Sequence, residues 1–317
     1  MKSNYSGSRF HGSDISLSTV NRGTVNRGAV EPWNRGTVNR EPDNLSRYDQ
    51  RLPNGLSSRV IKEHLRTRWL GQRAVCCFDV VESTNIEANR LVREGAPEGT
   101  VIVANAQTRG RGRLGRSWVS PPGNGLYLSI ILRPGCPPDW FPRLTLTAGV
   151  AVASAIQETG MRPQLKWPND ILIAGRKVGG ILIEAVFDNR QIGSAILGIG
   201  INVNTEQDEF PISVRNLVTS LRLSLDKPVS RIHLLQTLLH QLEQWYEFFC
   251  TGDFETILEA WCQFDNTLGR MVKVFLPERR LVGVAETLES DGTLLVRDKR
   301  GCLHRVVAGD VVHCRLG

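Results

Sequence analysis

Apolar residues are distributed very differently in the first 56 residues and in the rest of the chain. Residues 1–56 contain few Leu, Ile or Phe and carry the heptapeptide Asn-Arg-Gly-Thr-Val-Asn-Arg twice, at 21–27 and 34–40. Such a segment cannot bury enough apolar area to offset the entropy lost on ordering. We therefore predict a disordered tail over residues 1–56. It is either a solvated tail or the product of a misplaced start codon, and a basic arm for RNA or DNA is the alternative.

From Ser57 onward the apolar pattern predicts helices and strands. A helix capped by Ser57 opens this region, with apolar residues from Val60 to Trp69 at helical spacing. The other expected elements are strands at 75–81, 100–105, 126–132, 164–167, 171–173, 179–188 and 191–202, and helices at 84–93, 142–159, 231–250 and 254–265. The later strands follow one another through short turns. We therefore expect an α+β domain over residues 57–267, with a mixed or antiparallel sheet and helices on one side.

The pattern changes again near the C-terminus. Five short strands with turn residues between them are expected at 271–276, 281–288, 293–297, 303–307 and 311–314. We predict a small β-barrel over residues 268–317. It is too small to be very stable alone, so it should pack on the larger domain.

Composition limits the class of protein without naming a function. Hydrophobic residues make up 41% and charged residues 22% of 317 residues, as in soluble globular proteins. The longest apolar runs, 126–132 and 179–187, are shorter than the roughly 20 residues that a membrane-spanning helix needs. The first 30 residues contain no apolar stretch of the kind a secretory signal has. We therefore expect a cytoplasmic protein that spans no membrane.

Charge and cysteine content add little. The net charge is +7, but residues 1–60 carry nine Lys or Arg and five Asp or Glu, so more than half of the excess belongs to the tail. The basic balance is therefore a weak argument for nucleic-acid binding. The seven cysteines include no C-x-x-C pair, and we expect reduced, mostly buried thiols.

The most informative segment is the Arg/Gly loop, Gln107–Trp118. No Asp or Glu lies between Thr100 and Pro138, whereas five arginines do: Arg109, Arg111, Arg113, Arg116 and Arg133. Mutual repulsion and flexible glycines should leave such a loop poorly ordered until an anion neutralises it. Guanidinium groups and exposed backbone N–H groups suit a phosphate or a carboxylate, so the loop predicts an anion clamp.

Two other interpretations of this loop are weaker. Its glycines also fit G-x-G-x-x-G, but no acidic residue follows about 20 positions later and no helix starts there, which argues against a dinucleotide-binding turn. A single Trp118 and one loop give little support for a single-stranded RNA site.

A second cluster follows in Lys166–Asp170 and Lys177–Gly180. Two lysines and an aspartate at the ends of neighbouring strands can meet in one pocket, because hairpin neighbours lie within reach across the ladder. The alternative is a solvent-facing Asn-Asp turn with ordinary surface lysines.

These motifs together resemble the biotin-protein ligase family over about residues 60–317. The resemblance is carried by Glu82–Asn85, Gly110–Arg116 with Trp118, Lys166–Asp170, Lys177–Glu184 and Gly198–Asn204, in matching order. It implies a catalytic domain like that of class II synthetases and an SH3-like C-terminal barrel. It also implies a two-step reaction, in which biotin and ATP form biotinyl-5′-adenylate and a lysine of a biotin carboxyl carrier domain then takes the biotin.

The resemblance assigns roles to individual residues. The implied biotin pocket comprises Ser83, Thr84, Asn85, Gln107, Arg111, Gly112, Arg113 and Lys177, and the implied nucleotide contacts are Arg116, Trp118, Lys166, Asp170 and Asn202. Arg113, Lys166 and Lys177 are the implied catalytic residues, since fixed cations stabilise the charge that develops in both steps. Asp170 either orients Lys177 or helps to position Mg²⁺.

Three alternatives remain open. A lipoate or octanoate transferase of the same superfold is disfavoured by the Arg/Gly loop and the terminal barrel. A nucleic-acid-binding regulator would depend on the basic tail alone. Bifunctional family members carry an N-terminal winged helix-turn-helix, for which residues 1–56 lack the apolar periodicity, so we expect the monofunctional form without specific DNA binding. The resemblance also allows a homodimer without marking its interface.

Overall fold

The computed structural model describes residues 45–48, 56–137, 140–188, 191–276 and 279–314. All of them lie in one compact unit. Most of the tail predicted over 1–56 therefore lies outside the described residues. The exceptions make contacts: Leu45–Tyr48 is a short 3₁₀ helix (η1) whose Tyr48 ring lies 5.7 Å from the Phe78 ring, and Leu56 is only 1% exposed. Residues 45–48 and 56 of the predicted tail are thus part of the described structure.

The first helix is shorter than its apolar spacing predicts. Helix α1 (Ser58–Glu63) is capped by the Ser57 side chain, as expected, but it ends at Glu63. Leu65 and Trp69 instead pack against the core from the following loop. The backbone N–H groups of Trp69 and Leu70 donate to the buried carboxylate of Glu243, at 2.9 Å each, which holds this segment as a loop.

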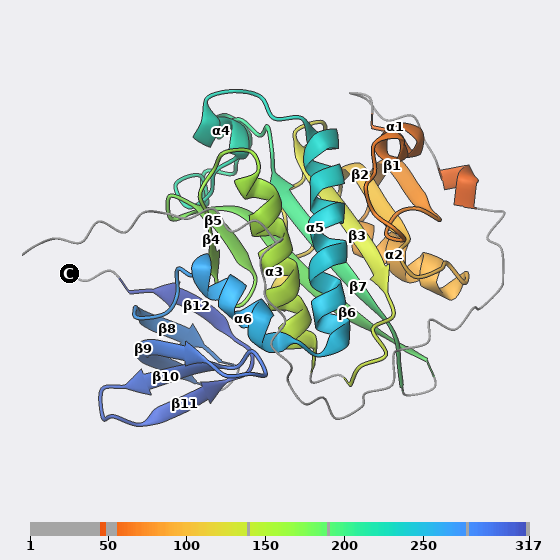
Figure 1. The fold of residues 1–317 in the computed structure, drawn as a ribbon. Helices are drawn as coiled ribbons and strands as arrows, with labels where there is room; N and C mark the ends of the chain where they lie inside the picture. The colour runs from red at the N-terminus through yellow and green to blue at the C-terminus, as the bar shows by residue number, and fades with distance from the viewer. Residues whose placement is uncertain (1–44, 49–55, 138–139, 189–190, 277–278, 315–317) are drawn as a thin grey trace, which may run out of the picture. The chain divides into compact units, whose positions relative to one another are not determined.

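A seven-stranded sheet forms the centre of the larger domain (Figure 1). Its strands are β1 (Val75–Val81), β2 (Val101–Gln107), β3 (Gly125–Leu132), β4 (Pro163–Lys166), β5 (Asp170–Ile173), β6 (Arg176–Asp188) and β7 (Gln191–Asn202). Their order is β1-β2-β3-β7-β6-β5-β4, with β1 and β2 parallel and the other neighbours antiparallel. The predicted mixed sheet is confirmed, and each predicted strand is present within a few residues of its expected bounds.

Helices cover both faces of this sheet, so the expectation of helices on one side was wrong. Figure 1 shows α3 (Phe141–Gln157) and α5 (Arg231–Thr251) side by side across one face, with α6 (Phe254–Gln263) beside α3. Helix α2 (Thr84–Arg93) packs on the opposite face through Ala88 and Leu91. The central strands require this arrangement because they are apolar on both faces: Val101 and Val103 face one core, Ile102 and Ala104 the other.

The C-terminal strands form a separate antiparallel sheet. They are β8 (Met271–Phe275), β9 (Arg280–Leu288), β10 (Leu294–Asp298), β11 (Leu303–Val306) and β12 (Asp310–His313), in the order β11-β10-β9-β8-β12. Trp167 fixes this sheet to the larger domain, as predicted for a small packed domain. Its backbone N–H donates to Thr267 and its ring N–H to the carbonyl of Gly292, and its side chain is buried.

A short helix between β7 and α5, α4 (Leu221–Leu225), was not predicted. Of the seven cysteines only Cys76 and Cys77 are fully buried, and Cys262 and Cys302 are exposed, so the expectation of mostly buried thiols was wrong. Among the described residues, none of the helices combines the length and the apolar character needed to cross a bilayer.

Candidate active site

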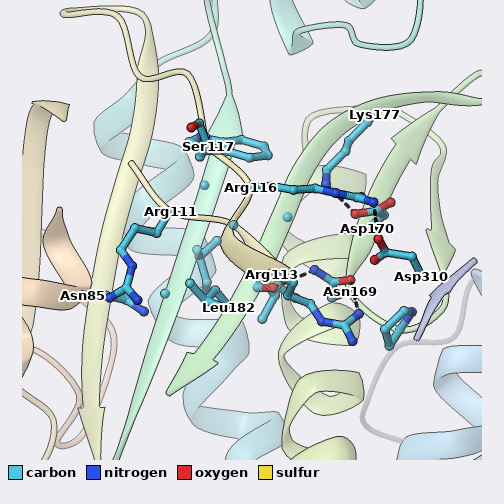
Figure 2. Close-up of a pocket in the computed structure, with 18 of the residues that line it drawn as sticks. Asn85, Arg111, Arg113, Arg116, Ser117, Asn169, Asp170, Lys177, Leu182 and Asp310 are labelled. Carbon is cyan, nitrogen blue, oxygen red and sulfur yellow. Dashed lines mark hydrogen bonds and ion pairs between the residues drawn. The ribbon is translucent and has the colours of Figure 1, made fainter. Parts of the chain in front are cut away.

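A cleft lies on the α2 face of the sheet, where the β1–α2 corner, the Arg/Gly loop and strand β12 meet. Of the 13 residues nominated from the sequence, 12 line it: Ser83, Thr84, Asn85, Gln107, Arg111, Gly112, Arg113, Arg116, Trp118, Lys166, Asp170 and Lys177. Asn202 is the exception. Figure 2 shows Asn85 and Arg111 on one side of the cleft and Lys177, Asp170 and Asp310 on the other, with Arg113 and Leu182 between them.

Uncharged polar groups build one end of the cleft. Ser83 is the N-cap residue of α2, which places Thr84 and Asn85 in its first turn, facing the sheet. Gln107 Oε1 accepts from the Thr84 backbone N–H at 2.9 Å. The Ser129 hydroxyl lies 2.8 Å from Thr84 Oγ1 and 2.6 Å from Asn85 Oδ1. This end can therefore offer several fixed donors and acceptors to a neutral, polar ligand.

Glycines in β7 form the floor of the cleft. A Cβ atom at Gly198 would lie 2.2 Å from Asn85 Oδ1, and one at Gly200 would lie 2.7 Å from the Trp118 ring. Only glycine lets both side chains lie against the strand. Trp118 in turn faces Lys177, whose Nζ lies 5.4 Å from the centre of the ring. The Trp118 ring N–H is buried and has no hydrogen-bond partner among the described residues, so it is a donor that a ligand can use.

The Arg/Gly loop folds back on itself as a tight hairpin. The Trp118 N–H donates to the Gly110 carbonyl at 2.8 Å and the Gly112 N–H to the Arg116 carbonyl at 2.7 Å. Leu114 and Gly115 turn the chain with φ of 54° and 72°. The chain continues as extended backbone and a turn before β3. No long helix follows the glycines, which agrees with the rejection of a dinucleotide-binding turn.

Carboxylates from distant segments pair with the loop arginines. Arg109 pairs with Glu82 at 2.8 Å, Arg111 with Glu184 at 3.1 Å, and Arg116 with Asp310. The acid-free stretch of sequence thus receives counter-ions through the fold, which reduces the expected repulsion among its arginines. That the loop is poorly ordered until an anion binds stays a prediction.

Arg113 is held differently from the other loop arginines. Its Nη1 donates to Asn169 Oδ1 at 3.0 Å and to the Gly309 carbonyl at 3.3 Å. Burial lowers the pKa of its guanidinium below the ordinary value, and the carboxylates of Asp310 and Asp170 oppose this shift. The nearby carboxylates pair with other cations, Asp310 with Arg116 and Asp170 with the two lysines. Among the described residues none forms an ion pair with Arg113, so its charge can be directed at a bound anion.

Asp170 bridges the two lysines. Its Oδ2 lies 2.8 Å from Lys166 Nζ and its Oδ1 lies 2.5 Å from Lys177 Nζ. Burial alone would raise the pKa of Asp170, but the charges of Lys177 and Lys166 outweigh it, and the pKa lies below its ordinary value. The predicted convergence of these residues is confirmed, and the solvent-facing turn is excluded.

Asn202 serves another segment. Its buried side chain donates from Nδ2 to the Thr219 carbonyl at 3.0 Å, outside the cleft lining. The Thr219 N–H donates to the Lys177 carbonyl, and the Lys177 N–H donates to the Leu217 carbonyl. Asn202 therefore supports the segment that fixes the backbone of Lys177, and its direct nucleotide contact stays a prediction.

Several lining residues were not nominated from the sequence. They are Ser117, Leu128, Trp167, Pro168, Asn169, Gly180, Ile181, Leu182, Gly198, Ile199, Gly200, Asp310, Val311 and Val312, and Glu184 pairs with two of the nominated residues. The spacing Gly198-x-Gly200 inside a strand was a usable signal, because strand glycines mark close approaches of other groups. No local signal connected Asp310 with a loop almost 200 positions earlier.

Comparison with known proteins gives a consistent result. The Biotin/lipoate A/B protein ligase family matches residues 77–202, and the Biotin protein ligase C terminal domain matches residues 267–314. The bifunctional ligase/repressor BirA of Bacillus subtilis is 36% identical over 260 residues, which cover 82% of this chain and 79% of BirA. The biotin–[acetyl-CoA-carboxylase] ligase of Mycobacterium tuberculosis is 30% identical, with 84% of this chain and 98% of that protein covered. A solved structure of the Aquifex aeolicus biotin protein ligase in complex with biotin and ATP matches with a TM-score of 0.68 and 30% identity, over 77% of this chain and 99% of that chain.

Proposed function

This chain belongs to the biotin protein ligase family, and from that premise we propose how its cleft attaches biotin, through biotinyl-5′-AMP, to a lysine of a biotin carboxyl carrier domain. The observation that supports this assignment is the division of the cleft. At the Asn85 end lie neutral polar side chains and an arginine that Glu184 already neutralises. At the other end Lys166 and Lys177 converge on Asp170, and Arg113 lies between the two ends. Biotin has the same division, with a neutral ureido ring at one end and a carboxylate at the other.

In the first step, a biotin carboxylate oxygen attacks the α-phosphorus of ATP, a mixed anhydride forms, and pyrophosphate leaves. Thr84, Asn85 and Gln107 hold the ureido ring in this proposal, and Arg111 and Gly112 close over it. Arg113 lies between the two reacting groups and reduces the repulsion between carboxylate and phosphate, while Lys166 stabilises charge on the phosphate oxygens. Arg116 and Trp118 hold the nucleotide, with the Trp118 ring available for stacking on adenine.

In the second step, the carrier lysine amine attacks the carbonyl carbon of the anhydride. The amine loses a proton and AMP leaves with the electrons of the broken carbon–oxygen bond. Lys177 lies on β6 with its ammonium group fixed by Asp170, so it can stabilise charge on the acyl oxygen and on the leaving phosphate. The Arg/Gly loop covers the cleft and keeps water from the anhydride until the carrier arrives.

Mg²⁺ enters this proposal only with the ATP phosphates. Both oxygens of Asp170 are held by the two lysines, and no group of three or more potential metal ligands occurs among the described residues. Of the two alternatives for Asp170, orientation of Lys177 and Lys166 therefore fits better than metal binding.

Biotin-dependent exchange of labelled pyrophosphate into ATP tests the first step. The expected result is exchange with biotin and not with lipoate, because the polar end of the cleft matches a ureido ring. Exchange driven by lipoate instead would support the transferase alternative. The second step is tested with a carrier domain and its acceptor Lys→Arg variant, of which only the first should become labelled with biotin.

Sequence-specific DNA binding is not part of the proposal. Residues 1–56 lack the apolar periodicity of a winged helix, and only residues 45–48 and 56 of this segment are described. Retention of the full-length protein on specific DNA in moderate salt would support the regulator alternative.

A further inference from the structure

Glu184 contacts two of the residues assigned above to biotin, and it has no role in the proposed chemistry. It lies on β6, on the same face as Gly180 and Leu182, which line the cleft. Its Oε2 accepts from Asn85 Nδ2 at 2.7 Å. Its Oε1 lies 3.1 Å from Arg111 Nη1. One carboxylate therefore connects helix α2 with the Arg/Gly loop, and Figure 2 shows the Arg111 side chain extending toward Asn85.

The contact continues into the polar end of the cleft. Gln107 is bonded to Thr84, Thr84 to Ser129, and Ser129 to Asn85, all within 2.6–3.3 Å. Glu184 joins this series to the loop at Arg111. The series involves α2, three strands and the loop, and three of its members, Thr84, Asn85 and Ser129, are less than 5% exposed. A change in the position of one member is therefore passed to its neighbours.

The orientation of the Asn85 amide depends on both of its neighbours. The carbonyl oxygen Oδ1 faces the Ser129 hydroxyl and the NH₂ group faces Glu184. A carboxylate has only acceptors, so it can receive Asn85 and Arg111 at the same time. A glutamine at this position has one oxygen and one NH₂ group, so one of the two donors would face another donor.

We propose that Glu184 is a positioning residue that couples the polar end of the cleft to the Arg/Gly loop. Its carboxylate orients the Asn85 amide for the ureido ring and docks Arg111 over the same site. The proposal depends on the proposed function for the identity of the ligand, but the docking of the loop does not require it. Since the lysine end of the cleft is organised separately by Asp170, loss of Glu184 should weaken biotin binding much more than nucleotide binding.

Glu184→Gln and Glu184→Asp test this coupling, with Glu82→Gln as the matched control. Glu82 also pairs with a loop arginine, Arg109, but that pair lies outside the cleft lining. In pyrophosphate exchange, we expect Glu184→Gln to raise the KM for biotin about tenfold and the KM for ATP less than twofold. The Arg111 side chain is half exposed, so the ion pair is screened and the effect should stay below that of a fully buried pair. Glu82→Gln should leave both constants within twofold.

Limited trypsin digestion without ligands gives a second readout. Cleavage within Gly110–Arg116 should be faster in Glu184→Gln than in the wild type, because Arg111 has lost its docking partner. Glu184→Asp keeps the charge on a shorter side chain. Its loop should be cleaved more slowly than that of Glu184→Gln, and its KM for biotin should lie between those of Glu184→Gln and the wild type. In an Arg111→Ala/Glu184→Gln double variant, the effects should be less than additive.

The outcomes separate this proposal from the proposed function. Equal increases in both KM values, or unchanged values and unchanged cleavage in Glu184→Gln, would overturn the coupling while wild-type exchange still supports the ligase. Absence of biotin-dependent exchange by the wild type would overturn the proposed function, and the digestion would still test whether Glu184 docks the loop.

Discussion

Arg113 and Asp170 are the two side chains that organise charge at the centre of the cleft. Arg113 is partly buried and donates to an amide oxygen and a backbone carbonyl, and in the described part of the chain no carboxylate forms an ion pair with it. Asp170 has the opposite arrangement, with one lysine on each oxygen. The Arg113 guanidinium can therefore interact with a bound anion, whereas Asp170 holds two lysine ammonium groups close together when no ligand is bound.

Replacement of Arg113 by alanine should weaken adenylate formation by about 2–3 kcal/mol, because phosphate and carboxylate oxygens lose a charge-assisted partner. Pyrophosphate exchange measures this loss. Arg109→Ala is the control, since Arg109 pairs with Glu82 and its side chain is 78% exposed. Near-normal exchange by Arg113→Ala would remove Arg113 from the catalytic residues.

Asp170→Asn should lower activity and also stability, by about 2 kcal/mol, because Lys166 and Lys177 lose their shared counter-ion. The pKa of Asp170 is lowered, so its contribution to stability is present above the ordinary carboxyl pKa of about 4 and is lost as the pH falls through the folded-state value. The stability difference between wild type and variant should therefore be constant from pH 7 to about 5 and should shrink below about pH 4. Urea unfolding across this range measures it, and a difference that grows on acidification would contradict the assignment.

At the scale of single elements, strand β7 contains two glycines that lower its own stability but leave space for side chains of the cleft. Glycine inside a strand weakens it, because it has no side chain to pack and loses more conformational entropy. Gly198 and Gly200 occur two positions apart on the cleft face of this central strand, opposite Leu182 and Gly180 of β6. The space that they leave is filled by Asn85 and Trp118.

Alanine substitutions in β7 should therefore separate the two ends of the cleft. Gly198→Ala displaces Asn85 and should raise the KM for biotin at least about tenfold, whereas Gly200→Ala displaces Trp118 and should act mainly on the KM for ATP. Gly149→Ala in α3 is the control, because a Cβ there makes ordinary contacts at 3.6 Å or more. It should stabilise the protein by up to about 1 kcal/mol and leave both constants unchanged. If Gly198→Ala and Gly200→Ala changed the KM for biotin and the KM for ATP in the same way, the two ends of the cleft would not be functionally separate.

At the scale of the whole molecule, segments from both ends of the described chain pack on the sheet domain, and the C-terminal one also contributes to the site. Strand β12 of the C-terminal sheet contributes Asp310, Val311 and Val312 to the cleft lining, and Trp167 holds that sheet in place. At the other end, η1 and Leu56 pack on the sheet domain before the first predicted helix begins. Arg90 donates to the Tyr48 hydroxyl at 3.0 Å and lies over its ring.

Two N-terminal deletions should therefore differ. Removal of residues 1–40 should leave ligation and thermal stability unchanged, because it keeps Tyr48 and Leu56. Removal of residues 1–56 should lower stability by at least about 2 kcal/mol, as expected for loss of a fully buried leucine and an aromatic contact. Thermal unfolding and carrier labelling of the two proteins measure this. If the two truncated proteins were equally stable, the folded domain would begin after residue 56, as the sequence predicts.

The sequence alone determined the strands of both sheets and the long helices, because hydrophobic periodicity is a local property of the chain. Its ordered motifs also identified 13 candidate site residues, and 12 of these line the cleft. Tertiary structure decided what those residues contact. The counter-ions of the Arg/Gly loop come from Glu82, Glu184 and Asp310, far from the loop in sequence. The Asn202 side chain donates to the Thr219 carbonyl, in a loop whose position no local sequence pattern predicts. Ion pairs and hydrogen bonds between distant segments depend on how the elements pack, and that packing is a property of the whole fold.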